Sequence, residues 1–385
     1  MSRTCARPTK PSGPQPEPRR FRPLGALLIF VLLPSLSATP AARAEERVAI
    51  QGLADAEGWN TGSDPNYLTR NEGDSGSVGR LRLWGFGDFS QRFQGFAMLA
   101  MEGGKATPTQ ETDYRVEQAY VRVLLGESRA TILQAGKLIQ PYGNFSKRYL
   151  STSNPLIGTP MNYELSYPFG VQLNGSAGRF DYMVAVLDSP FWKQAYDSKP
   201  ESYPRPALAA GVTPLVGFRL GGYATKGPYL SQISKSEDWL FPEDQLSDFE
   251  ERAYGLDLQY SVAHFELNGD MSQASLEVPY AGTARGRVYY VEPKFTISPR
   301  WYVAARYERG NVPNAHWDFG TVWEARRDRI HDVEAGFGFR IDPRFLIKAS
   351  YRAILDRASG PAEDDAVSVQ FSYSFDVNSW FRRQQ

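Results

Sequence analysis

Apolar side chains alternate with small or polar ones over much of this chain, and the pattern is clearest near its end. In "DAVSVQFSYSF", residues 365–375, every second position from 367 onward is apolar: Val367, Val369, Phe371, Tyr373 and Phe375. A period of two places successive side chains on opposite faces of an extended strand. One face of this strand therefore meets an apolar environment, and the other meets water.

The same alternation, bounded by turn residues, predicts sixteen strands. They are expected near 47–58, 79–89, 93–102, 114–125, 129–138, 169–177, 180–188, 206–213, 216–225, 251–261, 264–276, 286–297, 300–309, 330–341, 344–355 and 365–375. Seven connections between them are tight turns. Six of these turns lead into a strand that starts with a large aromatic residue: Phe93, Phe180, Phe218, Phe265, Trp301 and Phe345.

Short and long connections alternate strictly along the chain, and the longest runs from Ile139 to Pro168. A barrel that crosses an outer membrane joins its strands in this way, by short periplasmic turns and long external loops. Aromatic rings at one end of the strands suit a lipid–water boundary. The predicted fold is therefore all-β, a transmembrane antiparallel up-and-down β-barrel of about 16 strands. The alternative is a soluble β-sandwich or solenoid, in which the apolar faces would pack against protein.

The N-terminus reads as a secretory signal peptide. Arg19, Arg20 and Arg22 precede an apolar run at 24–38, and the small-residue site Ala42-Arg43-Ala44 follows. A membrane anchor is the alternative, but the apolar run is shorter than a spanning helix needs and Pro34 interrupts it. We therefore expect a signal peptide at 1–44, a barrel at 45–375 and a C-terminal extension at 376–385.

Charge and hydropathy narrow the class of protein further. The predicted signal peptide holds seven of the 43 basic residues and one of the 43 acidic ones, so the remaining chain is net acidic. An acidic balance argues against a nucleic-acid partner. The only cysteine, Cys5, lies in the segment expected to be removed. The mean hydropathy of −0.43 is expected for a barrel, because half of each strand would face water.

If the apolar positions face lipid, the alternate positions line the interior of the barrel. A charged side chain on the lipid face near the midplane would cost about 2–4 kcal/mol, so a row of charges identifies the inner face. The predicted pore-lining residues are Arg122, Arg219, Asp257, Glu266, Asp270, Glu292, Lys294, Arg306, Glu308, Asp332, Glu334, Arg340, Lys348 and Arg352. Turns centred on Pro299 and Pro343 would place Glu292 opposite Arg306 and Glu334 opposite Arg352.

Three short stretches carry a family resemblance: "QAGKLIQPYGNF" at 134–145, "FGVQLNGSAGRFDYMVAVLDSP" at 169–190 and the closing "VSVQFSYSF". With the signal peptide, they make the chain resemble bacterial outer-membrane porins, loosely the phosphate-selective O/P-type group. The closing stretch is similar to the signal that the outer-membrane assembly machinery recognises, and it would use the five alternating residues Val367 to Phe375. Family members usually end at the terminal aromatic residue, whereas ten residues follow Phe375 here.

The resemblance implies a water-filled channel for passive diffusion of small hydrophilic solutes or ions. It also implies a location in the bacterial outer membrane, contact with lipid and lipopolysaccharide, and a homotrimer. The loop at 139–168 would fold inward and constrict the pore with Lys147, Arg148, Tyr149 and Glu164; the alternative is an external cover. Anion-selective relatives would show an excess of basic pore residues, which this sequence does not supply.

Two other classes of function are alternatives to a channel. The first is a structural or adhesin-type barrel with a plugged lumen, acting through its external loops. The second is an enzyme, but the three histidines, His264, His316 and His331, lie in no nucleophile or metalloprotease motif. The sequence therefore predicts no catalytic residues, no cofactor and no metal site.

Overall fold

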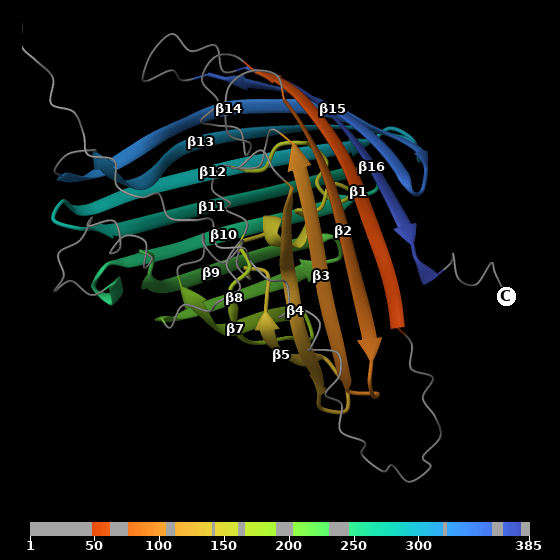
Figure 1. Ribbon diagram of the computed structural model, residues 1–385, viewed down its shortest axis with the longest axis horizontal. Helices are drawn as coiled ribbons and strands as arrows, with labels where there is room; N and C mark the ends of the chain where they lie inside the picture. Colours follow the sequence, from red (N-terminus) through yellow and green to blue (C-terminus); the bar gives the residue numbers. More distant parts are fainter. Residues whose placement is uncertain are drawn as a thin grey trace, which may run out of the picture. The chain divides into compact units, whose positions relative to one another are not determined.

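The computed structural model describes residues 48–61, 76–104, 112–140, 143–160, 166–189, 203–230, 246–318, 322–355 and 365–378. Sixteen antiparallel strands close into one barrel, in which each strand pairs with its neighbours in the chain and β1 pairs with β16 (Figure 1). The predicted all-β up-and-down barrel is therefore confirmed, and the two-sheet sandwich is excluded. No helix in the described part of the chain is long and apolar enough to cross a membrane.

The strands agree with the sixteen predicted ones in number and order. Their bounds are β1 (Val48–Thr61), β2 (Gly76–Asp88), β3 (Phe93–Gly104), β4 (Asp113–Leu125), β5 (Thr131–Lys137), β6 (Phe169–Ala177), β7 (Phe180–Ser189), β8 (Tyr203–Leu215), β9 (Phe218–Pro228), β10 (Glu250–Val262), β11 (Phe265–Val278), β12 (Gly282–Thr296), β13 (Trp301–Asp318), β14 (Val322–Asp342), β15 (Phe345–Ile354) and β16 (Ala366–Asp376). Two single-turn helices, η1 (Phe145–Lys147) and η2 (Leu246–Asp248), lie in the connections.

The two faces of the barrel wall differ in polarity, as the alternation requires. On β16, Val367 is 54% exposed and Phe371 44%, whereas Ser368, Gln370 and Ser372 are buried. Exposed apolar side chains occur on most other strands, so the outer surface of the closed sheet is apolar. A folded chain exposes such a surface only where lipid or another apolar partner covers it.

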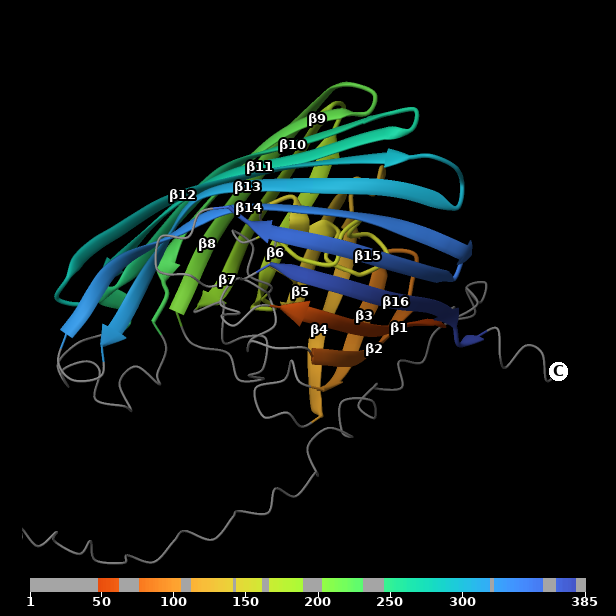
Figure 2. The same cartoon turned by 90° about the horizontal axis from the view of Figure 1, so that it is seen from above.

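The six aromatic residues expected at strand starts are the first residues of β3, β7, β9, β11, β13 and β15. All six strands leave the end of the barrel where the connections are short, which we call the turn end. The opposite end, where β1 and β2 or β5 and β6 are joined by longer connections, is the loop end (Figure 2).

Two connections at the loop end are shorter than the sequence predicts. The predicted strands leave loops near 277–285 and 310–329, and this part of the prediction is wrong. Only three residues separate β11 from β12, and three separate β13 from β14. Pro313 lies within β13. The register of β13 with β12 ends at Asn311, so Pro313 needs to pair only with β14. A proline is tolerated on a strand edge that has no partner for its missing N–H.

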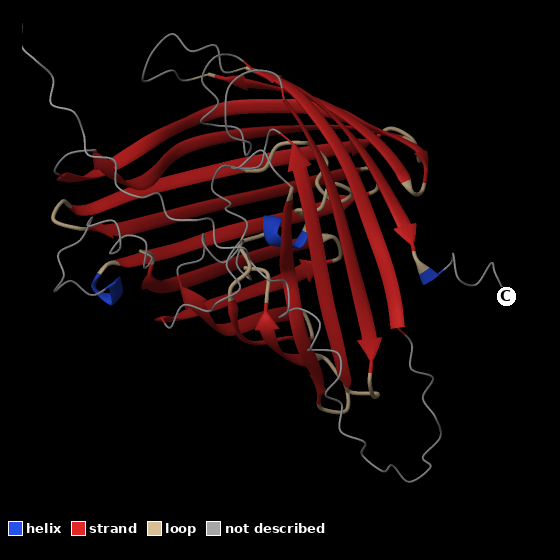
Figure 3. Ribbon diagram, in the orientation of Figure 1, coloured by secondary structure: helices blue, strands red, loops and turns tan. Residues whose placement is uncertain are grey.

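The connection between β5 and β6 enters the barrel. We call its described residues 143–160 the inner segment. In Figures 1 and 2 its yellow trace runs inside the ring of strands, and Figure 3 shows the short helix η1 in blue among the red strands. The inner segment and the charged inner wall form the candidate functional site.

Candidate functional site: the interior of the barrel

All fourteen charged residues predicted for the interior lie on the inner face of the wall. Nine are buried: Asp257, Asp270, Glu292, Arg306, Glu308, Asp332, Glu334, Lys348 and Arg352. The other five are partly buried: Arg122, Arg219, Glu266, Lys294 and Arg340. Their neighbours along the same strands, such as Val291 and Phe337, are exposed on the outer face. Of the four predicted constriction residues, Lys147, Arg148 and Tyr149 belong to the inner segment, and Glu164 lies outside the described residues.

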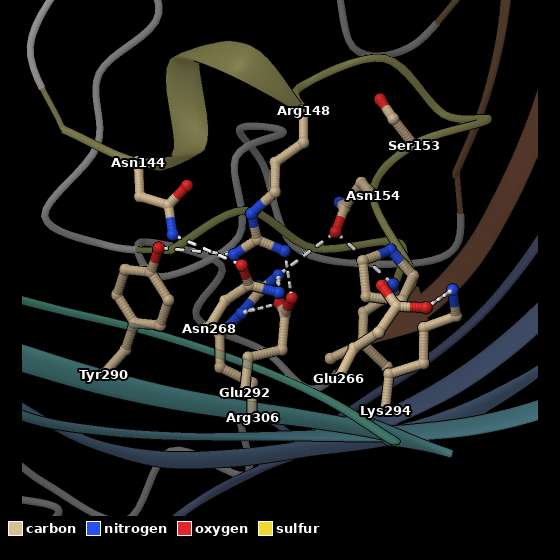
Figure 4. A network of polar contacts seen from close by, with 12 residues as sticks. Asn144, Arg148, Ser153, Asn154, Glu266, Asn268, Tyr290, Glu292, Lys294 and Arg306 are labelled. Carbon is tan, nitrogen blue, oxygen red and sulfur yellow. Dashed lines mark hydrogen bonds and ion pairs between the residues drawn. The ribbon is translucent and has the colours of Figure 1, made fainter. Parts of the chain in front are cut away.

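Arg306 on β13 is the centre of a charged network (Figure 4). Its guanidinium donates to Glu292 on β12 at 2.8 Å and to Glu334 on β14 at 3.4 Å. The same group donates to the carbonyl of Gly158 at 2.9 Å and to the side-chain oxygen of Asn154 at 3.2 Å. Arg148 of the inner segment also binds Glu292. Buried carboxylates are stable only when they are paired in this way, so the network fixes the segment to the wall.

The two predicted cross-strand pairs have different outcomes. Glu292 forms the expected ion pair with Arg306. Glu334 lies opposite Arg352 in the register of β14 and β15, as predicted. The Arg352 guanidinium, however, donates to Asp332 at 2.8 Å. Glu334 instead accepts hydrogen bonds from the backbone N–H groups of Ile157 and Gly158, because the inner segment lies against it.

Lys348 on β15 holds the inner segment through its backbone. Its ammonium donates to the carbonyl oxygens of Ser151, Asn154 and Leu156 at 2.9, 3.1 and 2.9 Å. Lys348 is 1% exposed, so its ammonium has lost its hydrogen bonds to water. The three bonds to carbonyl oxygens replace them. Sequence reasoning placed Lys348 on the inner wall, but it carried no signal for this anchoring role.

Contacts on the other side of the segment reach a different part of the wall. Tyr149 hydrogen-bonds Gln118 on β4, and Ser151 donates to Asp55 on β1. Asn144 donates to Asn268 on β11 at 3.3 Å. Burial raises the pKa of Tyr149 to about 12, so the phenol stays protonated as a hydrogen-bond donor. Between described residues, the hydrogen bonds of the segment to the wall thus go to strands β1, β3, β4 and β10–β15.

Strands β7, β9 and β10 carry a separate group of ion pairs on the inner wall. Arg219 on β9 binds Asp181 on β7 and Asp257 on β10. A cavity of about 380 Å³ lies beside it, lined also by Gln259, Glu266 and Asn268. Lys147 of the inner segment interacts electrostatically with Arg219, Asp181 and Asp257. Its side chain is open to solvent, but partial burial by the surrounding wall, together with the charge of Arg219, lowers the pKa of Lys147.

A second charged network on the inner wall was missed from the sequence. On β2, Arg80 binds Glu102 and Arg82 binds Glu117, each at 2.8 Å, and Arg115 on β4 bridges both carboxylates. The stretch "RLRL" at 80–83 carried the signal, because its arginines alternate with leucines that face outward. Among the described residues, no three His, Cys, Asp or Glu side chains form a group that could hold a metal ion.

No protein-family model matches the chain, and no curated protein is similar enough in sequence to match it. Solved structures do match. OmpF of Salmonella typhi, in a complex with daunomycin, has 10% identity and a TM-score of 0.57, and the match covers 86% of this chain and 98% of that one. OprB of Pseudomonas putida at high pH has 11% identity and a TM-score of 0.58, covering 86% and 94%. An anion-selective porin from Comamonas acidovorans has 12% identity and a TM-score of 0.58, covering 86% and 100%. The chain therefore has the fold of outer-membrane porins.

Proposed function

We propose that this protein is a porin of the bacterial outer membrane, a water-filled channel for passive diffusion of small hydrophilic solutes or ions. The observation that carries the proposal is the polarity of the closed sheet, with apolar side chains outside and paired charges inside. A barrel of sixteen strands is too wide for its own side chains to fill, so an aqueous lumen remains. The likeness of fold to outer-membrane porins supports the same reading.

In this proposal, one segment near each end of the sequence directs export and assembly. The signal peptide at 1–44 directs the chain to the periplasm. The assembly machinery then recognises the apolar face of β16, from Val367 to Phe375. In the membrane, lipid and lipopolysaccharide surround the barrel, and three copies form a homotrimer. Asp376, the first residue of the expected C-terminal extension, still belongs to β16.

The inner segment constricts this channel. It is bound to the part of the wall that runs from β10 through β16 and β1 to β4, most densely at the Arg306 network and Lys348, so solutes pass between the segment and β5–β9. Lys147, Arg219, Asp181 and Asp257 border that passage with two positive and two negative charges. Such a balance favours weak ion selectivity, and the pore admits small hydrophilic solutes by size. The resemblance to phosphate-selective porins does not identify the solute that passes through this channel.

A plugged structural barrel is the second candidate function. The observation that favours it is the dense hydrogen bonding of the inner segment, which reaches nine of the sixteen strands. In this case the lumen would be sealed, and the external loops would bind a partner. The two functions differ in whether the purified barrel conducts ions.

Single-channel recording in planar bilayers tests the proposal. The wild-type protein is compared with a variant in which residues 145–158 are replaced by a short Gly-Ser linker. We expect open channels from both, with the conductance of the variant larger by about twofold or more because the lumen is wider. Conductance from the variant alone would establish the plugged barrel. Absence of conductance from both, with folded protein verified by heat-dependent gel migration, would exclude the porin.

A further inference from the structure

Three arginines of β12 and β13 lie on the outer face of the barrel, which carries apolar residues closer to the turn end of the same strands. Arg285 and Arg287 on β12 and Arg309 on β13 are all exposed. We call them the arginine cluster. Closer to the turn end of these strands, the same face carries Val291 and Val303, which are 41% and 43% exposed. Relative to these valines, the cluster lies toward the loop end of the barrel.

The cluster is compact because of the register of β12 and β13. Arg287 is paired with Asn311, and Arg309 is paired with Tyr289. Arg287 and Arg309 are therefore diagonal neighbours, about 7–8 Å apart in an antiparallel pair. Arg285 and Arg287 are two residues apart on one strand, a rise of about 7 Å. Three guanidinium groups on side chains of this length can reach a single anionic group.

Two tyrosines separate the arginine cluster from the apolar band. The rings of Tyr289 on β12 and Tyr307 on β13 are in contact, with their centroids 6.2 Å apart. Tyrosine is the residue that marks the boundary between acyl chains and headgroups, because its ring is apolar and its hydroxyl is polar. The order along the strands, apolar residue, tyrosine, arginine, places the cluster at headgroup height.

An arginine on β10, two strands away from β12, shows the contrast. On β10, Arg252 is also exposed on the outer face near the loop end, but it binds Glu250 and Glu277. In the described part of the chain, no carboxylate lies within ion-pair distance of an arginine of the cluster. The side-chain amide oxygen of Gln273 accepts a hydrogen bond of 2.9 Å from Arg287. The positive charge of the cluster is thus left for an external anion.

We propose that the arginine cluster binds the phosphate groups of a phosphorylated glycolipid in the outer leaflet. Guanidinium groups suit this ligand, because each can donate two parallel hydrogen bonds to phosphate oxygens. The acyl chains of the same lipid would cover Val291, Val303 and the two tyrosine rings. This inference rests on the outer-membrane location in the proposed function, but it does not depend on conduction through the lumen.

The test uses the purified barrel in detergent and bisphosphorylated lipid A as the probe, with the same lipid after enzymatic removal of both phosphates as a second ligand. Binding is measured by native mass spectrometry over a range of lipid concentrations. The triple variant Arg285→Gln, Arg287→Gln, Arg309→Gln is compared with a control variant, Arg252→Gln, Lys226→Gln, whose cations are already paired with Glu250.

We expect the phosphorylated lipid to bind the wild type and the control variant alike. The triple variant should bind it about tenfold more weakly or worse, because three charge-assisted contacts are lost. Equal binding by the triple variant would overturn the proposal, and so would equal binding of both lipids by the wild type. Heat-dependent gel migration checks folding, and channel recording of the triple variant separates this result from the proposed function, because its conductance should be unchanged.

Discussion

At the scale of the residue, the two adjacent cations of the inner segment, Lys147 and Arg148, differ in whether their charge can act on passing ions. Arg148 is bound by Glu292, so its charge is largely neutralised and its contribution is structural. Lys147 is the next residue along the chain, and its ammonium is open to solvent beside Arg219. The sequence predicted both for the constriction without separating them, because the ion pair of Arg148 depends on a residue 144 positions away.

Replacing Lys147 should therefore change the selectivity of the channel. In Lys147→Gln, one of the two positive charges beside the passage is lost while Asp181 and Asp257 remain. The cation-to-anion permeability ratio should rise by about twofold or more, as measured by the reversal potential in a KCl gradient. An unchanged ratio would show that ions do not pass between the segment and β5–β9.

The lowered pKa of Lys147 gives the same prediction a pH dependence. A lysine with a lowered pKa loses its proton at a lower pH than a free lysine does, so the wild-type channel should become more cation-preferring as the pH rises through the alkaline range. Lys147→Arg is the matched control, because a guanidinium stays charged throughout. Its selectivity should stay constant over the interval in which the wild type changes.

At the scale of the element, the β13–β14 hairpin is the largest departure from the prediction. The predicted strand near 300–309 ends before Gly310 and Pro313, two residues of types that disfavour strand interiors. The structure continues both strands to the tip, and β14 also contacts β11 and β12, which are not its neighbours in the sheet. Trp323 near the tip is 4% exposed and packs in a cluster with Leu230, Val278 and Ala284. This packing joins segments far apart in the sequence, and no local pattern contains it.

Removal of that packing should release the hairpin. Trp323→Ala is expected to lower the free energy of unfolding by about 3–5 kcal/mol, the usual cost of truncating a buried tryptophan. Urea denaturation in detergent measures the change, and limited proteolysis should show faster cleavage near the tip. Leu355→Ala removes a side chain that is 53% exposed just after β15, and it should leave both measurements nearly unchanged. A stable, protease-resistant Trp323→Ala would mean that the cluster does not hold the hairpin.

At the scale of the whole molecule, the sequence predicted the barrel because the constraint is repeated sixteen times. Each strand carries the same period, so an error of two residues at one boundary does not change the inner face. The Glu292–Arg306 pair was also predictable, because a tight turn fixes the register of its hairpin. The course of the inner segment was not, since Lys348 and Glu334 hold it through backbone groups that any residue would supply. Local periodicity determines the wall, and long-range contacts determine what narrows it.

The barrel closes through the pairing of β1 with β16, and a substitution at one glycine of β1 can test how that pairing is stabilised. Gly52 lies opposite Phe375, and a methyl group at Gly52 would be 2.1 Å from the tip of the Phe375 ring. Gly52→Ala must therefore displace the last aromatic residue of the predicted assembly signal. We expect the free energy of unfolding to fall by about 1–3 kcal/mol, the range for overpacking, and refolding into detergent to be less complete. Gly79→Ala on β2 is the control, because a methyl group there would have no heavy atom within 4 Å. If the two variants refold equally well, the ring over Gly52 is not needed to close the barrel.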